Sequence, residues 1–243
     1  MFGVQSRVIA SITLRATMGR KRVFLFAIPP LILVLVTVAL KLAHPPAPAW
    51  PSHILGDFGF SVVLPLTALI IGTSVLGAEI DDGSVVHLLA TPVRRSTVIM
   101  TKFVVAAVLT MIFVAVPELL AGLIATGGAT RLAVGLFVGA LAGSVIYNAV
   151  FVMISVVTTR AIAVGLLYLL VWEAVLGNFV SGARILSVEQ YSLGVANSIA
   201  HSTSLNAHLG LPTAVVMGAV VTVATLAFAI RRLGSFSLKG DAV

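Results

Sequence analysis

The sequence predicts an all-α membrane protein with six transmembrane helices, and two observations lead to this fold class. Hydrophobic residues make up 59% of the 243 residues and charged residues only 9%, whereas about a quarter of the residues in a soluble globular domain are charged. A chain of this length also accommodates about six apolar spans of roughly 20 residues each, joined by short connections. We therefore expect a single transmembrane domain over residues 1–243, without a large soluble domain.

Residues 1–22 predict a helix that lies on the cytoplasmic surface of the membrane. Arg7, Ser11 and Arg15 recur at four-residue spacing, and apolar residues occupy the complementary stripe. Burial of that stripe and attraction to anionic lipid headgroups would hold such a helix at the interface, which makes membrane lipids an expected partner. A disordered basic tail is the alternative interpretation.

Residues 23–43 predict the first membrane span, with a kink at Pro29 and Pro30. A cleaved signal peptide is the competing interpretation. Its apolar core would be only about 7 to 15 residues long, whereas the core here approaches about 20, so a membrane span is favoured. Residues 44–59 follow as an expected proline-rich outer loop, which contains no Lys or Arg.

Five later segments are apolar and long enough to cross a bilayer. The expected spans are 60–78, 98–125, 132–157, 162–180 and 213–230. In the fourth span of the chain, Gly135, Gly139 and Gly143 share one helix face at four-residue spacing. Small residues on one face let another helix approach closely, so this face is an expected packing site.

Residues 181–212, between the last two expected spans, are too polar and too interrupted to cross the membrane. They are also too apolar for a freely solvated loop, with Ile185, Leu193 and Ile199 among their residues. Backbone polar groups at membrane depth need partners within the protein. We therefore expect short outer helices here, of a kind that dips into the outer leaflet or caps the bundle.

Residues 79–97, between the second and third spans, form a charged segment that must lie in water. Ser84 can cap a short helix, and Leu88 and Leu89 contribute to an apolar face on that helix before Pro92 ends it. A short exposed helix with a small apolar face predicts a docking partner. An ordinary charged loop with one capped turn is the alternative.

The distribution of basic residues predicts which side of the membrane each connection faces. With both termini in the cytoplasm, twelve of the 15 Lys and Arg residues lie inside, and only Lys41, Arg131 and Arg184 lie outside. Basic residues are retained on the cytoplasmic side. The net charge of +7 is therefore explained by membrane orientation, and nucleic acid is not an expected partner.

The charged segment resembles the loop between the second and third helices of ABC-2 type transporter permeases. The shared pattern is an acidic residue, Gly-Ser, a Leu-Leu pair, Pro, Arg, and a Lys in the next helix. In this chain it comprises Glu79, Gly83, Ser84, Leu88, Leu89, Pro92, Arg94 or Arg95, and Lys102. The match is strong for about two dozen residues, and the six-helix layout agrees over the whole length.

The resemblance implies that this loop carries a coupling helix, which rests on a separate ABC ATPase subunit. The ATPase-coupling residues would then include Asp82 beside Glu79 and the loop residues of the shared pattern. It also implies a bacterial cytoplasmic membrane location and an interfacial helix at the N-terminus. The chain would pair with a second permease copy or a homologue, because six spans are too few to enclose a two-sided pathway comfortably.

No catalytic, cofactor or metal site is expected in this chain. It contains no Gly-Lys-Ser or Gly-Lys-Thr phosphate loop, so ATP and Mg would be bound by the partner ATPase. An intramembrane serine protease is disfavoured, because Ser144 has no His in the sixth span to act as base. The chain has no cysteine, and its histidines match no metal-binding spacing.

Two carboxylates remain within the apolar spans, Glu118 in the third and Glu173 in the fifth. Charges at such depth usually face a polar cavity or a partner. One hypothesis is that both line an outward cavity for a cationic amphiphile or form part of a proton path. The alternative is structural pairing with Arg131, Arg184 or backbone donors.

The function that the sequence favours is that of the permease subunit of an ATP-driven exporter. Aromatic residues make up 7% of the chain and include only three Tyr and two Trp, which favours a path for drugs, lipids or peptides over one for polysaccharide. Two alternatives stay open. One is a secondary transporter that uses Glu118 and Glu173 with an ion gradient; the other is a non-transporting membrane regulatory subunit.

Overall fold

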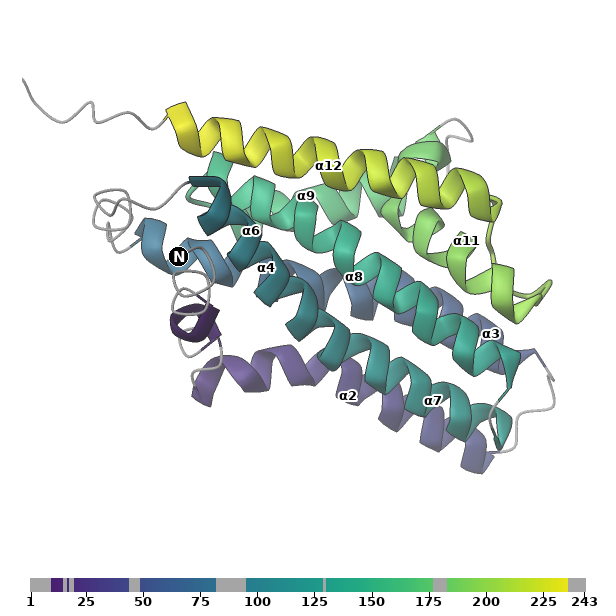
Figure 1. Cartoon of the computed structure of the whole chain (residues 1–243). Coiled ribbons are helices and arrows are strands. Elements are labelled where there is room, and N and C mark those ends of the chain that lie inside the picture. The colour runs from purple at the N-terminus through teal and green to yellow at the C-terminus, as the bar shows by residue number, and fades with distance from the viewer. Residues whose placement is uncertain are drawn as a thin grey trace, which may run out of the picture.

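The computed structural model describes residues 10–14, 17, 20–43, 49–81, 95–128, 130–176 and 183–235. These residues form helices and short connections, and no strand occurs among them. The long helices run roughly side by side (Figure 1). The start of α2 and the ends of α4 and α12 lie at one end of the bundle (Figure 1). We call this the inner end, since the basic residues predict it to be cytoplasmic, and the opposite end the outer end.

Five helical stretches among the described residues are long and apolar enough to cross a membrane. They are Val23–Ala43, Trp50–Val75, Arg95–Thr126, Arg131–Val157 and Leu211–Leu233. A shorter apolar helix, Ala161–Glu173, corresponds to the expected fifth span. Residues 177–180, the end of that expected span, lie outside the described residues.

The first two stretches contain four helical elements. α2 covers Arg20–Ala43 and includes Pro29 and Pro30. The second stretch is continuous through α3 (Trp50–His53), the π-helix η1 (Ile54–Val63) and α4 (Leu64–Asp81).

The second helix begins ten residues before the expected span of 60–78, so the second half of the predicted proline-rich loop is helical. Pro51 stands in the first turn of α3. A helix tolerates proline there, because the amide hydrogens of the first turn have no partner within the helix.

The middle of the chain forms two long, nearly antiparallel stretches. α6 (Arg95–Thr110), the π-helix η2 (Met111–Ala115) and α7 (Val116–Thr126) follow one another without a break. Gly127 ends α7 in the left-handed conformation, with φ of 75°. α8 (Arg131–Val157) begins after Thr130, whose side chain accepts a hydrogen bond from the amide of Ala133.

The last third of the chain includes the expected outer segment. α9 (Ala161–Tyr168) continues into the π-helix η3 (Leu169–Leu176). The 3-10 helix η4 (Ala183–Leu186) and the helix α11 (Val188–Ala200) follow, and α12 (Leu211–Ser235) ends the described part. Short helices are therefore present in the described part of the segment expected at 181–212.

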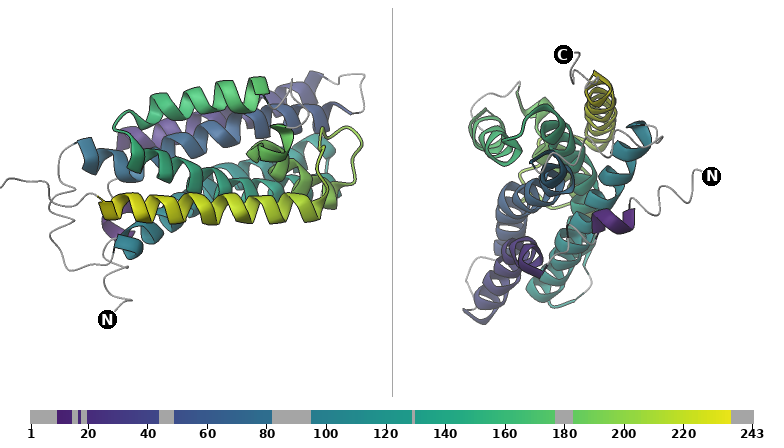
Figure 2. Two further views of the ribbon diagram at one scale, coloured as in Figure 1. Left: turned by 90° about the horizontal axis from the view of Figure 1, so that it is seen from above. Right: turned by 90° about the vertical axis from the view of Figure 1, so that its left-hand side faces the viewer.

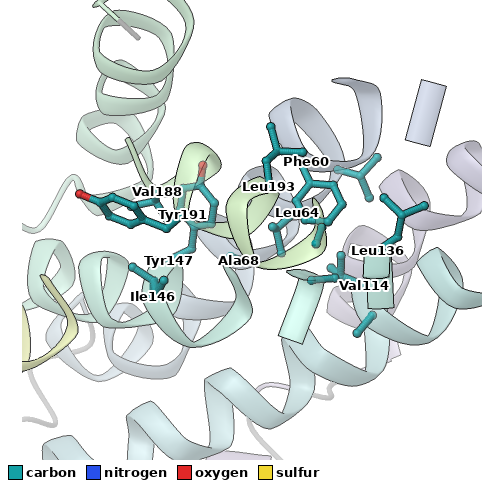
Figure 3. Packing of buried hydrophobic residues seen from close by; sticks show 14 of the residues in the cluster. Phe60, Leu64, Ala68, Val114, Leu136, Ile146, Tyr147, Val188, Tyr191 and Leu193 are labelled. Carbon is teal, nitrogen blue, oxygen red and sulfur yellow. The ribbon is translucent and has the colours of Figure 1, made fainter. Parts of the chain in front are cut away.

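α8 lies at the centre of the bundle. In the most apolar part of α8, 72% of the residues are buried. In the corresponding parts of α2 and α12, which lie at the periphery, only 22% are buried. Figure 2 shows α12 and α2 at separate edges of the bundle. The larger core cluster joins the second helix, α8 and α11; in Figure 3, Phe60 and Leu64 lie beside Leu193.

Gly135, Gly139 and Gly143 line the contact between α8 and α11. A Cβ at Gly135 would lie 2.5 Å from the carbonyl oxygen of Ala196, and one at Gly139 would lie 2.7 Å from that of Ser192. Both distances are far below van der Waals contact. The absence of side chains on this face therefore lets the backbones of the two helices come together.

Candidate functional site

A polar pocket lies between the second helix, the α9–η3 helix, η4, α11 and the loop 201–210. Its volume is about 550 Å³. Three carboxylates line it, from Asp57, Glu173 and Glu189, together with the guanidinium group of Arg184. An apolar wall completes the lining; it comprises Val62, Leu66, Leu166, Leu169 and Leu170.

Glu173 lies at the point where η3 meets the start of α11. Its carboxylate accepts hydrogen bonds from the Ser187 hydroxyl at 2.5 Å, the Val188 amide at 2.9 Å and the Tyr168 hydroxyl at 3.2 Å. Ser187 is also the N-cap of α11, since its hydroxyl accepts a hydrogen bond from the Gln190 amide. A carboxylate at this position is stabilised by the positive end of the helix dipole.

Glu189 lies in the first turn of α11 and faces the second helix. One of its carboxylate oxygens accepts a hydrogen bond from the Ser61 hydroxyl at 2.5 Å. Burial raises the pKa of Glu189 to about 7, and the negative charges of Glu173 and Asp57 act in the same direction, while the Ser61 hydrogen bond opposes them. Glu189 therefore titrates close to neutral pH.

Polar side chains attach the loop 201–210 to the rest of the pocket. The Asn206 amide group donates a hydrogen bond to Asp57 at 3.0 Å. Gln190 donates to the backbone carbonyl of Asn206 at 3.3 Å and accepts from the amide of His208 at 3.0 Å. This loop thereby links η1 to α11 on the polar side of the pocket.

Glu118 does not line the pocket. It is fully buried in α7, and neither of its carboxyl oxygens has a hydrogen-bond partner among the described residues. It packs against Gly59 of η1, where a Cβ would lie 2.0 Å from one carboxyl oxygen. Of the two intramembrane carboxylates predicted to share a cavity, only Glu173 lines the pocket.

The alternative of structural pairing with Arg131 finds no hydrogen bond at Glu118. Neither of its carboxyl oxygens has a hydrogen-bond partner among the described residues. The backbone amide of Val188 donates a hydrogen bond to the Glu173 carboxylate. Glu173 therefore has a structural connection as well as a place in the pocket lining.

Most of the expected ATPase-coupling segment lies outside the described residues. This applies to Asp82, Gly83, Ser84, Leu88, Leu89, Pro92 and Arg94. Glu79 belongs to α4, but its side chain is not described. Arg95 begins α6, and its guanidinium group donates a hydrogen bond to the backbone carbonyl of Leu233 in α12 at 3.0 Å.

Lys102 connects the third helix to the second near the inner end. Its ammonium group donates a hydrogen bond to the carbonyl oxygen of Val75 at 2.6 Å, and its side chain is 1% exposed. Lys102 is thus buried between helices, where a backbone carbonyl of α4 accepts a hydrogen bond from its ammonium group.

Sequence reasoning did not single out several residues of the pocket. They are Asp57, Ser61, Glu189, Gln190, Asn206 and His208. The signal available was weak: Asp57 and Glu189 are two of only eight acidic residues, and both lie on the expected outer side. No group of three or more His, Cys, Asp or Glu residues in the described part of the chain is placed to hold a metal ion.

The fold and the pocket define a polytopic helical membrane protein with a polar site between its helices. A family model described as ABC-2 family transporter protein matches residues 5–234, and the chain therefore belongs to this family. This confirms the resemblance based on the charged segment. The family consists of membrane subunits without an ATP-binding motif of their own, and it implies partnership with ABC ATPase subunits. No curated protein matches the chain significantly.

Proposed function

We propose that this chain is the permease subunit of an ATP-driven exporter, which moves a hydrophobic or amphipathic substrate outward through the bacterial cytoplasmic membrane. Both termini would lie in the cytoplasm, and two permease chains would pair with two separate ATPase subunits. The observation that carries the proposal is the match to the ABC-2 transporter family over residues 5–234. The polar pocket with an apolar wall supports an amphipathic substrate.

The helices that flank the charged segment are suited to transmit a push from an ATPase. α6, η2 and α7 form one continuous stretch of 32 residues, Arg95–Thr126, that reaches from the inner to the outer end. Lys102 connects this stretch to α4, and Arg95 connects it to α12. A force on residues 82–94 would therefore act on several helices at once.

In the proposed cycle, ATP-driven closure of the ATPases displaces the coupling segment. The second and third spans carry the displacement toward the outer end, where η1 forms part of the pocket wall. Access to the transport pathway changes as these rigid helices move against the rest of the bundle. ATP and Mg are bound only by the partner subunits in this cycle.

Uncoupling variants test the proposal. We expect Gly83→Pro, or Arg94→Glu combined with Arg95→Glu, to reduce export at least about tenfold while ATP hydrolysis continues, because the push no longer reaches α6. The measurement uses proteoliposomes that contain the permease and the ATPase that copurifies with it, and it records hydrolysis and substrate export together.

Arg131→Glu is the matched control, because it makes the same charge reversal at an exposed position at the start of α8, away from the inner end. This control is expected to export at the unaltered rate. Normal export by the Arg94 and Arg95 double variant would refute the coupling role, and export without any ATPase subunit would refute the proposed function.

An ion-gradient-driven transporter is the second candidate, favoured by one observation. Glu118 is a fully buried carboxyl without a hydrogen-bond partner among the described residues, which is a common feature of proton-linked sites. In this case Glu118→Gln would abolish export, and a protonophore would stop export even in the presence of ATP. Export that persists under both conditions excludes this candidate.

A further inference from the structure

The polar pocket has two walls of opposite chemistry, and together they define the kind of molecule that fits. We infer that the pocket binds a hydrophobic cation, in which an ammonium group contacts the carboxylates and an attached apolar chain lies along the leucine wall. This inference rests on the proposed function, since it names the substrate class of the exporter. It assigns a binding role to Asp57 and Glu189.

The polar wall favours a positive ligand. Among the described residues that line the pocket, three are carboxylates and Arg184 is the single Lys or Arg. Ser61 is the only hydrogen-bond donor to Glu189 among the described residues, so this carboxylate has further capacity to accept. An ammonium group supplies both the missing donors and the opposite charge, whereas an anion would be repelled.

The apolar wall gives the chain of an amphiphile a route into the pocket. Leu166 and Leu170 of the α9–η3 helix line the pocket, yet they are 41% and 56% exposed. The lining is therefore continuous with the apolar outside of the bundle. A ligand enters with its chain along these leucines and its ammonium group toward Glu189. The volume of about 550 Å³ lies within the range of roughly 300 to 1,000 Å³ that is typical of small-molecule sites.

Binding of a permanent cation must depend on pH if Glu189 contacts it. The charged and titratable groups that face Glu189 are Asp57 from η1, Glu173 from η3, Arg184 from η4 and His208 from the loop 201–210. The pKa of Glu189 is about 7, and a cation prefers the ionised carboxylate. Affinity therefore rises as the pH increases through 7, by about tenfold between pH 6 and pH 8.

The chain contains a natural fluorescent reporter for this experiment. It has two tryptophans, and Trp172 directly precedes Glu173 and donates a hydrogen bond to the backbone carbonyl of Leu186 at 3.2 Å. In the Trp50→Phe background Trp172 is the sole tryptophan. The purified full-length protein in phosphatidylglycerol nanodiscs is titrated with dodecyltrimethylammonium, and with dodecyl sulfate and dodecyl maltoside as probes of equal chain length.

We expect a saturable change in Trp172 fluorescence with the cation alone. Glu189→Gln should raise its Kd about tenfold or more, because it removes the charge of a partly buried carboxyl. Asp57→Asn should raise it by a smaller factor, because the Asp57 side chain is 53% exposed and water screens its charge. Asp81→Asn is the matched control: it makes the same chemical change at the inner end of α4, at a residue that does not line the pocket, and it should leave the Kd unchanged. Two variants are used so that a folding defect in one, detected by circular dichroism, leaves the other to decide.

Equal binding of the three probes would overturn the inference, and so would an unchanged Kd in both variants or a pH-independent Kd. Competition by added phosphatidylethanolamine would identify an aminolipid as the source of the ammonium group, and a lack of competition would identify a free amphiphile. Because the titration needs no ATPase, a lack of specific binding would refute only the pocket assignment and not the proposed function. Specific binding without ATP-dependent export would refute only the proposed function and not the pocket assignment.

Discussion

At the scale of single residues, Gly59 is the described glycine at which an added Cβ would come nearest to a neighbouring atom, 2.0 Å from a carboxyl oxygen of Glu118. The carboxyl group of Glu118 occupies the space that a side chain at position 59 would need. A buried carboxyl without partners is costly in its ionised form. Gly59 therefore has a steric role: it makes room for a carboxyl group that has no hydrogen-bond partner among the described residues.

We expect Gly59→Ala to destabilise the protein by about 1 to 3 kcal/mol, as overpacking in a filled core does. The added methyl group would lie 2.0 Å from the Glu118 carboxyl oxygen, so one of the two must move. Thermal unfolding of the purified protein in detergent measures the loss.

A double-mutant cycle with Glu118→Ala separates this clash from a general cost of alanine in η1. The second substitution removes the carboxyl group that the new methyl group would meet. Gly59→Ala should therefore cost much less stability in the Glu118→Ala background than in the unaltered protein. Additive losses would show that the two residues do not compete for space.

At the scale of helices, the packing of α8 on α11 fixes the position of the pocket, because α11 carries Glu189 and its N-terminus binds Glu173. Gly135, Gly139 and Gly143 of α8 set this position, because they let α11 approach closely. We expect Gly135→Ala to lower stability by roughly 1 to 3 kcal/mol, because the new Cβ would meet the backbone carbonyl of Ala196, which cannot rotate away.

Gly128→Ala is the matched control, because nothing lies within 4 Å of a Cβ at that position. It should leave the unfolding temperature nearly unchanged. If Gly135→Ala were equally harmless, the close approach of α8 and α11 would not contribute to stability, and the position of α11 would depend on its other contacts.

The sequence predicts the long helices well because their apolar runs exceed the bilayer thickness, a property that needs no knowledge of neighbours. The prediction from sequence is wrong at the start of the second helix. The prolines near residue 50 are typical of a loop, whereas Pro51 fits the first turn of α3. The sequence therefore predicts a loop at Asp57.

The sequence does not predict the pocket, because the residues that form it are far apart in the chain. Glu189 and Ser61, for example, are brought together only by the packing of α11 on the second helix.

At the scale of the whole molecule, the orientation in the membrane is the feature on which the proposed mechanism depends. The natural chain contains no cysteine, so a single introduced cysteine is a unique chemical label. We expect His87→Cys to react with a membrane-impermeant maleimide only when the cytoplasmic side is accessible. Ser204→Cys, in the loop 201–210, should react in intact cells.

Met100→Cys is a suitable control in the same background. Its side chain is 41% exposed on the apolar surface of α6, where lipid would exclude a charged reagent, so it should react slowly from either side. Labelling of His87→Cys in intact cells would invert the topology and remove the charged segment from the reach of any cytoplasmic ATPase.

The π-helical winding of η1 limits how this bundle can change shape. A π-helix places more residues in each turn than an α-helix, and it often occurs at functional positions. A change of Ile54–Val63 to an α-helix would rotate Asp57 and Ser61 around the helix axis relative to Leu66. The hydrogen bonds between Asn206 and Asp57 and between Ser61 and Glu189 would then break. The side chains of Asp57 and Ser61 would therefore leave the pocket lining if η1 changed from π-helical to α-helical winding.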